Sequence, residues 1–440
     1  MAAILSQAPE LIRASTSTAR RRVIAFGASL AFLSFLDRAA ISQAAPTISK
    51  ELHLSTVQMG LVFSSFGITY ALCEIPSGWL CDRLGARKLL TRVVLFWSLL
   101  TAATGAAWNL PSLVAVRLLF GAGESGCFPA LARVFRTWLS PSERNAAEGI
   151  KAASARWGAA LTPALIAGLS AYFSWRQIFG LFGLLGVVWT ALFVHWYRES
   201  PHRDDLPEPA AEYVYESVAT DAVWWGKLLR SRSVWCLGIQ WFCHYYGFYF
   251  YITWLPIYLY QVRGLDLRKG ALAAGLPLFS AGLGCLLSGY ALTALARHLQ
   301  NTAKARKWLG YLAYGGAGLL LLLFTQISNP LMAVTAMSLS SFAAEFSSPI
   351  SWTTAMDIGG DRVGTVSGFM NMLGHLGGSI APSVVAVLVS RGAGGWNTAF
   401  GVSAAIYGAG ALCWAFIEPV RDLGSETRSI VQNKARWRSG

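Results

Sequence analysis

Two adjacent charged residues, Asp37 and Arg38, lie halfway along an apolar stretch that begins at Val23. The stretch is long enough to cross a bilayer, and an ionised group near the middle costs roughly 2.5–3.5 kcal/mol to insert. Charges kept at that cost indicate a polar solute or ion that crosses the membrane. Arg38 offers a bidentate fork for a carboxylate, whereas Asp37 is interpreted as proton-linked because its neutral form is cheaper to bury. The alternative is a structural pair with the fourth or fifth span.

A second pair of opposite charge, Arg117 and Glu124, lies in a later apolar stretch. The two residues are seven positions apart, which is two helical turns, so they share a helix face. Burial favours the neutral form of a carboxyl group, and a nearby guanidinium favours the carboxylate. Glu124 is therefore a candidate proton carrier tuned by Arg117, and the alternative is a structural ion pair inside the amino-terminal bundle.

Three further polar residues could contact an anionic substrate. Arg156 is a second cation within the membrane, and it serves either the substrate or Glu124. Asn371, flanked by glycines, carries an amide that can bind hydroxyls or a carboxylate, and Tyr70 can donate its hydroxyl in the same way.

The second half of the chain holds additional candidates whose role the sequence leaves open. They are His244, Tyr245, Glu345, Trp352 and His375. A lone histidine in an apolar span is usually a hydrogen-bonded core residue. Glu345 is either a third protonatable site or a partner for a basic group. Trp352 either stacks on a sugar face or packs in the core.

Long apolar stretches must position these groups, because the 440 residues are 54% hydrophobic and only 13% charged. Soluble proteins contain about 25% charged residues. We predict an all-α membrane protein with twelve transmembrane helices in two six-helix halves. The predicted spans are 23–46, 57–80, 88–108, 111–138, 145–172, 177–197, 233–260, 270–296, 307–327, 330–356, 362–390 and 396–417.

Lys and Arg gather in alternate connections, which predicts that both termini are cytoplasmic. The longest polar connection separates six spans from six, as in transporters built from two similar halves. Its second part, near Val223 to Leu229, is interpreted as a surface helix. The predicted organisation is a cytoplasmic segment 1–22, an amino-terminal bundle 23–198, a cytoplasmic central loop 199–232, a carboxy-terminal bundle 233–417 and a basic cytoplasmic tail 418–440.

Composition argues against several other classes of protein. The seven cysteines are scattered without a Cys-x-x-Cys pair or zinc spacing, so neither disulfides nor a metal site is predicted. No nucleophile–base pair or phosphate loop indicates an enzyme. The net charge of +14 arises mostly from loops that set orientation, so nucleic-acid binding is not expected. Protons are the expected coupling ion, and no cofactor is predicted.

The connection after the second span reads Gly-Trp-Leu-Cys-Asp-Arg-Leu-Gly-Ala-Arg-Lys over residues 78–88. The glycines allow tight turning, and the aspartate can accept bonds from the start of a neighbouring helix. We interpret this segment as a conformational latch. Its predicted members are Gly78, Asp82, Arg83, Gly85 and Arg87.

With these residues the chain resembles the anion–cation symporter family of the major facilitator superfamily over nearly its whole length. The matching segments are Asp37-Arg38-Ala39, the latch at 78–88, Arg117 with Glu124, Trp352 with Asp357-Ile358-Gly359-Gly360, and Asn371 with Gly377-Gly378. The resemblance implies that Asp37 and Glu124 are the proton-linked acids. It also implies that Arg38, Tyr70 and Asn371 hold the carboxylate and hydroxyls of a substrate.

Two departures from the family pattern concern the cargo. Ala40 replaces the more usual asparagine, and Arg156 stands where some sugar-acid carriers have an uncharged polar residue. The expected function is proton-coupled uptake of an organic anion, with a hexonate, hexuronate or aldarate as the expected cargo. The expected form is a monomer in the cytoplasmic (inner) membrane. The alternatives are a facilitator, an antiporter or a transport-inactive receptor.

Overall fold

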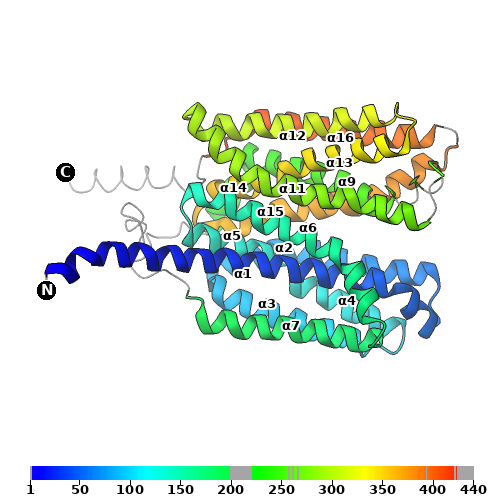
Figure 1. Ribbon diagram of the computed structural model, residues 1–440, viewed down its shortest axis with the longest axis horizontal. Coiled ribbons are helices and arrows are strands. Elements are labelled where there is room, and N and C mark those ends of the chain that lie inside the picture. Colours follow the sequence, from blue (N-terminus) through cyan, green and yellow to red (C-terminus); the bar gives the residue numbers. More distant parts are fainter. Residues whose placement is uncertain are drawn as a thin grey trace.

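The computed structural model describes residues 2–198, 221–255, 258–259, 262–264, 267–392, 394–420 and 423. Most of the central loop and basic tail predicted at 199–232 and 418–440 therefore lies outside the described residues. Within the described ranges the regular secondary structure is helical, and the long helices run side by side along the longest axis of the molecule (Figure 1).

The described helices form six long rods before residue 199 and six after residue 220, when α4 is counted with α5 and α13 with α14. The first six are built from α1 Ala2–Glu51, α2 Thr56–Leu84, α3 Ala86–Thr104, α4 Leu110–Glu124, α5 Cys127–Trp138, α6 Pro141–Leu169 and α7 Trp175–Trp196. The others are built from α9 Arg232–Thr253, α11 Leu267–Leu299, α12 Thr302–Phe324, α13 Pro330–Phe346, α14 Ser348–Gly359, α15 Val363–Val389 and α16 Gly395–Phe416. A short helix, α8 Asp221–Arg230, forms where the surface helix was predicted.

Polar residues close the ends of these largely apolar helices. At the start of α2, Ser55 Oγ accepts a hydrogen bond of 3.2 Å from the backbone N–H of Gln58, whose side chain accepts one of 2.8 Å from the backbone N–H of Ser55. Ser174 and Gln177 form the same capping box before α7. First-turn N–H groups have no partner inside their own helix, so such caps define where each helix begins.

Two predicted spans, 111–138 and 330–356, are each broken into two helices. The first breaks at Ser125 and Gly126, between α4 and α5, and the second at Ser347, between α13 and α14. Small residues at a break leave room for a change of direction, and Pro349 suits the first turn of α14 because its missing N–H would have no partner there. The breaks occur at the same rod of each half, the fourth.

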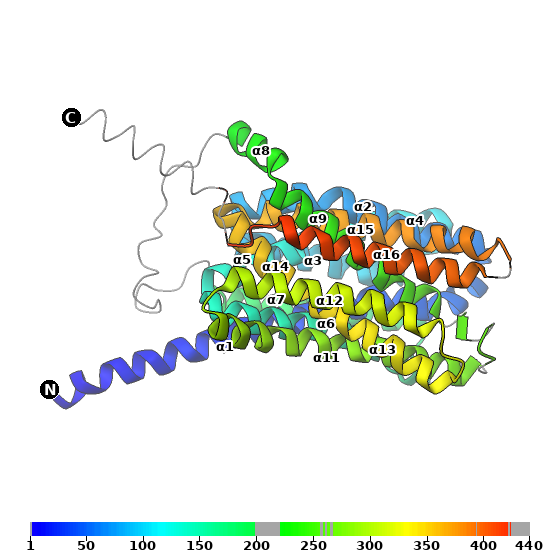
Figure 2. The same cartoon turned by 90° about the horizontal axis from the view of Figure 1, so that it is seen from above.

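The two halves pack against each other through α2 with α15 and α6 with α11. Within the amino-terminal half, α1 packs on α6 and α3 on α7, and within the other half α12 packs on α16 and α11 on α13. Figure 1 shows the two groups of helices as adjacent bundles with α2, α15, α6 and α11 between them, and Figure 2 shows α2 and α15 on one side of the molecule and α6 and α11 on the other. The facing surfaces of these four helices therefore bound the region between the halves.

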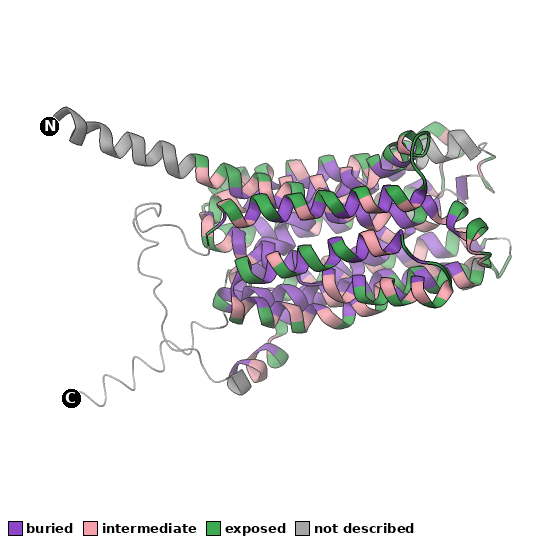
Figure 3. Cartoon of the chain, turned by 90° about the horizontal axis from the view of Figure 1, so that it is seen from below, coloured by how far each residue is buried: buried purple, intermediate pink, exposed green. Residues whose placement is uncertain are grey.

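The outer surface of the bundle is apolar. Large side chains on outward faces are well exposed, as the exposed bands along the outer helices in Figure 3 show. Examples are Leu99, Leu184, Leu192, Leu312 and Leu319. Eight helical stretches of the described chain are long and apolar enough to cross a membrane, and one of them, Pro330–Val389, includes more than one helix. A surface of this kind suits lipid rather than water, so the chain is a multi-pass membrane protein.

Candidate functional site

Arg38 and Glu124 form an ion pair in the amino-terminal half. Arg38 Nε donates a hydrogen bond of 2.9 Å to Glu124 Oε1, and Ser34 Oγ donates one of 2.5 Å to the same oxygen. Ser34 and Arg38 are one turn apart on α1, which places both beside the last residue of α4. Glu124 is fully buried, whereas the Arg38 side chain keeps 12% of its exposure. Glu124 thus pairs with Arg38, a partner that sequence spacing did not single out.

Aromatic rings surround the Arg38 guanidinium. Its Cζ lies 4.3 Å from the ring centre of Tyr70, 5.2 Å from that of Phe35 and 5.6 Å from that of Phe128. Ring faces attract a guanidinium and hold its plane in place. The Nη2 atom is buried without a hydrogen-bond partner among the described residues. The aromatic rings and Glu124 thus hold the orientation of the Arg38 guanidinium.

Asp37 lies on a different face of α1 from Arg38. Thr101 Oγ1, on α3, is 3.5 Å from Asp37 Oδ2, and the carboxyl group lies within electrostatic reach of Glu124 and Arg117. Arg117 is buried with its guanidinium 4.8 Å from the ring centre of Phe66. The four charged groups picked from the sequence therefore lie in one electrostatically coupled region of the amino-terminal half.

Asn371 connects the halves. Its Nδ2 donates a hydrogen bond to Glu74 Oε1 on α2, and its Oδ1 accepts one of 3.0 Å from Trp241 Nε1 on α9. Beside this contact the Tyr70 and His375 rings are 4.4 Å apart, centre to centre. Glu74 was not among the predicted site residues. The available signal was an acidic residue well inside the predicted span 57–80.

Arg156 and Glu345 form a second ion pair, and it also crosses between the halves. Arg156 Nη2, on α6, lies 2.8 Å from Glu345 Oε1 on α13. His244 Nε2 is 3.4 Å from the same oxygen, and the His244 ring stacks on Trp241. The sequence left open whether Arg156 pairs with Glu124, and in the structure it contacts Glu345 instead. Of the two roles considered for Glu345, the structure shows the partner of a basic group.

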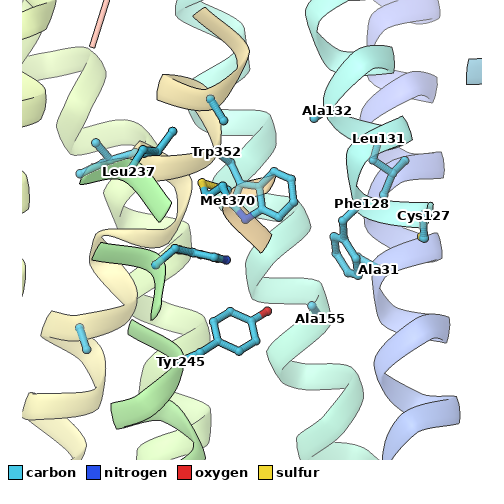
Figure 4. Close-up of a cluster of buried hydrophobic side chains, with 14 of the residues drawn as sticks. Ala31, Cys127, Phe128, Leu131, Ala132, Ala155, Leu237, Tyr245, Trp352 and Met370 are labelled. Atoms are coloured by element: carbon cyan, nitrogen blue, oxygen red, sulfur yellow. The ribbon is translucent and has the colours of Figure 1, made fainter. Parts of the chain in front are cut away.

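A narrow cavity lies between the halves beside these pairs. Its lining residues are Phe35, Phe128, Lys151, Ala152, Ala155, Arg156, Trp241, Tyr245, Ser348 and Trp352. Figure 4 shows Tyr245 and Trp352 of the carboxy-terminal half directed toward Phe128 and Ala155 of the other half. About 20 Å³ is open to the centres of water molecules, enough for a water but not for an organic acid. A solute can therefore enter only after the halves separate at one end.

Lys151 is a cavity residue that the sequence analysis missed. Its ammonium lies 4.2 Å from the ring centre of Trp352 and 2.5 Å from Glu148 Oε2, one turn earlier on α6. Both side chains are almost fully buried. The signal was present, because Glu148 and Lys151 both fall inside the predicted span 145–172.

The latch residue Asp82 joins the two halves near one end of the bundle. Its carboxylate accepts hydrogen bonds from the backbone N–H groups of Gly364 and Thr365, each 2.8 Å, and from Thr365 Oγ1 at 2.6 Å. These N–H groups belong to the first turn of α15, where a helix attracts negative charge. Asp82 also lies 3.5 Å from Arg133 Nη1.

The other latch residues support this contact. Gly78 packs so closely on the backbone of Gly364 that a side chain at position 78 would collide with it. Gly85 has φ +85°, a conformation that favours glycine, between α2 and α3. Arg83 lies over the Trp79 ring, and Arg87 donates to the carbonyl of Val194 at 2.8 Å.

The same end of the bundle carries further contacts between halves. Arg136 donates to the Met356 carbonyl at 3.0 Å, and Arg144 lies 3.4 Å from Asp357, which also binds Arg306 at 2.7 Å. We call this the basic end, defined by Arg83, Arg136, Arg144, Arg306 and Arg362. Nearer the opposite end of the contact helices, a Cβ added at Gly60, Gly168 or Gly275 would meet nothing within 4 Å. The halves are thus closed together at the basic end.

Two bundles of membrane-crossing helices, with ion pairs buried between them, define a transport protein built from two halves. The chain belongs to the major facilitator superfamily, since the model of that family matches residues 27–382. Among solved structures, a proton:xylose symporter, XylE, covers 91% of this chain and 96% of its own at 15% identity, with a TM-score of 0.73. The match to the transporter FucP in an outward conformation covers 90% of this chain and 99% of the FucP chain at 16% identity, with a TM-score of 0.71.

Curated relatives are carriers of organic anions. A probable sulfoacetate transporter of Cupriavidus necator is 34% identical over 90% of this chain and 93% of its own length. A probable galactarate/D-glucarate transporter of Escherichia coli is 31% identical over 82% of this chain and 86% of its own length. A hexuronate transporter of Bacillus subtilis is 28% identical over 82% of this chain and 85% of its own length. The predicted resemblance is confirmed, and the chain is a transporter rather than an enzyme.

Proposed function

We propose that the chain is a symporter that takes up an organic anion together with protons by alternating access. In this proposal it works as a monomer, crosses the cytoplasmic membrane twelve times and has both termini in the cytoplasm. The positive-inside rule supports that orientation, because the basic end holds many arginines in short connections. The names of its relatives support an organic acid as cargo, with sugar acids and sulfoacetate as the first candidates.

The observation that carries the proposal is the buried pair of Arg38 and Glu124, 2.9 Å apart. An anion that binds Arg38 competes with Glu124 for the same guanidinium. A buried carboxylate that loses its counter-ion costs several kcal/mol, a cost that protonation removes. Anion binding therefore favours proton binding at Glu124, and release of either favours release of the other.

The surrounding residues complete the proposed site. Asp37 acts as the second proton-linked acid, held beside Thr101 and within reach of Arg117. Tyr70 and Asn371 contact the hydroxyls or the carboxylate of the substrate from α2 and α15. Binding there replaces the contact between Asn371 and Glu74, so occupancy by the substrate and the packing of the two halves influence each other.

Alternating access follows from the contacts between the halves. With the basic end on the cytoplasmic side, the described form is closed toward the cytoplasm by Asp82 and its partners on α15. Opening that end requires the loss of these hydrogen bonds and of the contact between Arg144 and Asp357. If more protons than anionic charges enter, the membrane potential drives uptake by roughly 2.3 kcal/mol per net charge per 100 mV.

Counterflow in proteoliposomes tests the proposed function. Vesicles loaded with sulfoacetate, glucuronate or galactarate are diluted into the labelled acid, with and without a pH gradient. Symport predicts accumulation on the side to which protons flow. Flux without accumulation contradicts coupling and indicates a facilitator, and accumulation against the proton flow indicates an antiporter. Exchange of none of these acids would contradict the proposal and indicate a receptor.

A further inference from the structure

We propose that Lys151 and Arg156 form a second anion subsite in the cavity, opposite Arg38. The carried anion is then a short dianion whose two acidic groups are separated by one or two carbon atoms. This inference rests on the proposed function, because it takes Arg38 as the first anchor of the substrate. It narrows the cargo to sulfocarboxylates and dicarboxylates.

Lys151 is placed to meet a solute. It lines the cavity with 1% of its side chain exposed, and its ammonium lies over Trp352, itself a cavity residue. Its counter-ion Glu148 lies on the same helix, so the pair moves as a unit when the halves separate. Of the two residues only Lys151 is among those that line the cavity, so it is the ammonium, and not the carboxylate, that is placed to meet a solute.

Arg156 behaves differently, because its counter-ion lies on the other half. Its contact with Glu345 joins α6 to α13, and separation of the halves lengthens it. The Arg156 Nε atom already has no hydrogen-bond partner among the described residues. An acidic group of the substrate can therefore replace Glu345 when the cavity opens. The subsite then has one cation that stays paired, Lys151, and one that becomes available, Arg156.

The spacing of the cations limits the length of the anion. Arg38 Cζ lies 5.6 Å and Lys151 Nζ 5.5 Å from the centre of the Phe128 ring, so the two charges are at most about 11 Å apart. Arg38 Cζ and Arg156 Cζ lie 5.2 Å and 5.4 Å from the centre of the Phe35 ring, which gives a similar limit.

A charge-assisted contact places the central atom of an acidic group roughly 4 Å from its cation. Two such contacts leave at most about 3 Å between the acidic groups. One carbon atom between the groups spans that distance, and two carbon atoms span it when the chain is bent. An extended six-carbon diacid places its carboxyl carbons about 6 Å apart, given C–C bonds near 1.5 Å, and exceeds the limit. An anion with one acidic group would leave one cation site without a partner.

The aromatic lining strengthens this selection. Half of the residues that line the cavity are aromatic and leave little room for water: Phe35, Phe128, Trp241, Tyr245 and Trp352. Charges interact more strongly where water is excluded, so an unmatched cation is costly there. A dianion matches both subsites, and Ser348 adds a hydroxyl that can donate to an acidic oxygen.

The test is a competition series on the full-length protein in proteoliposomes. Counterflow of labelled sulfoacetate is measured against unlabelled sulfoacetate, malonate, succinate, acetate, galactonate and galactarate. We expect the short dianions to inhibit at least tenfold better than acetate, galactonate or galactarate. Comparing the inhibition by sulfoacetate with that by malonate then shows whether the site prefers a sulfonate or a carboxylate as the second acidic group.

Variants connect the preference to the subsite. Lys151→Gln should raise the KM for sulfoacetate at least tenfold and abolish the advantage of dianions over acetate, whereas Lys151→Arg should preserve that advantage. Lys50→Gln, an exposed lysine on α1, is the matched control and should leave the KM unchanged. If Lys151→Gln does not fold, the competition series and Lys151→Arg still decide the question.

Two outcomes separate this inference from the proposed function. If galactonate or galactarate exchanges as well as malonate, and Lys151→Gln leaves the preference unchanged, the second subsite is wrong while transport of an organic anion stands. If none of the acids exchanges, the proposed function itself fails.

Discussion

The guanidinium of Arg156 lies 2.8 Å from the carboxylate of Glu345, and the two residues belong to opposite halves of the molecule. Both side chains are buried, and His244 contacts the same carboxylate oxygen from α9. A buried ion pair that spans two moving bodies has to break when they separate. Its strength therefore contributes to the energy difference between closed and open forms.

Removing one member of this pair should destabilise the closed form. We expect Glu345→Gln to lower the free energy of unfolding by about 3–5 kcal/mol, because it leaves Arg156 charged and unpaired. The double variant Arg156→Met/Glu345→Met should recover most of that loss. Thermal unfolding in detergent measures both. Strictly additive effects of the two substitutions would show that the pair is not coupled.

Glu124→Gln separates proton coupling from substrate binding. The amide keeps the size of the side chain but cannot release a proton, so pH-driven accumulation should fall at least tenfold. Counterflow, which needs no net proton movement, should stay within about threefold of the wild type. Accumulation that remains at the wild-type level would remove Glu124 from the proton pathway.

The affinity for the anion should depend on the shape of the Arg38 side chain as well as on its charge. Arg38→Lys keeps the charge but loses the planar fork that lies between Tyr70 and Phe35. A hydrogen bond to a charged group contributes about 1.5–3 kcal/mol, so anion affinity should fall at least tenfold in Arg38→Lys and further in Arg38→Ala. Binding is followed by tryptophan fluorescence. Affinity within threefold of the wild type for Arg38→Ala would assign Arg38 a structural role only.

The close approach of α2 and α15 at the basic end can be tested with a methyl group. Gly78→Ala places a Cβ against the backbone of Gly364, so the basic end should loosen. Hydrogen–deuterium exchange in the first turns of α15 should rise at least fivefold. Gly60→Ala, which meets nothing within 4 Å, is the matched control. Equal exchange in the two variants would show that backbone contact does not close this end.

Glu143, at the start of α6 and outside the predicted spans, gives a pH-dependent prediction. Partial burial opposes its ionisation, but hydrogen bonds from Ser140 and the nearby Arg20 lower the pKa of Glu143 below its usual value. A depressed pKa stabilises the fold above the pKa of the unfolded chain, and that contribution is lost as the pH falls through the folded value. Glu143→Gln should therefore lower the free energy of unfolding at pH 7 by less than about 1 kcal/mol, which thermal unfolding detects as a slightly lower Tm. The difference should shrink as the pH falls below the usual titration range of a glutamate, and a difference that stays constant as the protein is acidified would contradict the assignment.

The rods and their division into six and six could be predicted from sequence, because lipid-facing helices require long apolar runs. The breaks in the fourth rod of each half could not, since both pieces are apolar and hydropathy does not report a change of direction. Ser125 with Gly126 was the available hint. Charged residues such as Asp37 and Arg38 could be identified from the sequence because they interrupt long apolar runs.

The pairing of these charges could be predicted only in part, because the sequence left open a pair between the first span and the fourth or fifth and a basic partner for Glu345, without saying which residues meet. Arg38 with Glu124 and Arg156 with Glu345 depend on which helices pack together, and α6 and α13 are far apart in the chain. Lys151 and Glu74 were overlooked although both lie inside predicted spans, 145–172 and 57–80, because a single charge in an apolar run does not show what it contacts. Their burial becomes evident only when the neighbouring helices are placed.

The contact between α2 and α15 brings main-chain atoms close together, with Gly78 against Gly364 and Gly368 against the carbonyl of Glu74. The cavity, in contrast, is lined partly by side chains of α6, among them Ala152 and Arg156. The close packing of α2 on α15 and the lining of the cavity thus depend on different atoms. Replacing a cavity residue such as Ala152 should therefore change the shape of the cavity without disturbing the contact of α2 with α15, which makes Ala152 a suitable position for engineering the solute preference of this carrier.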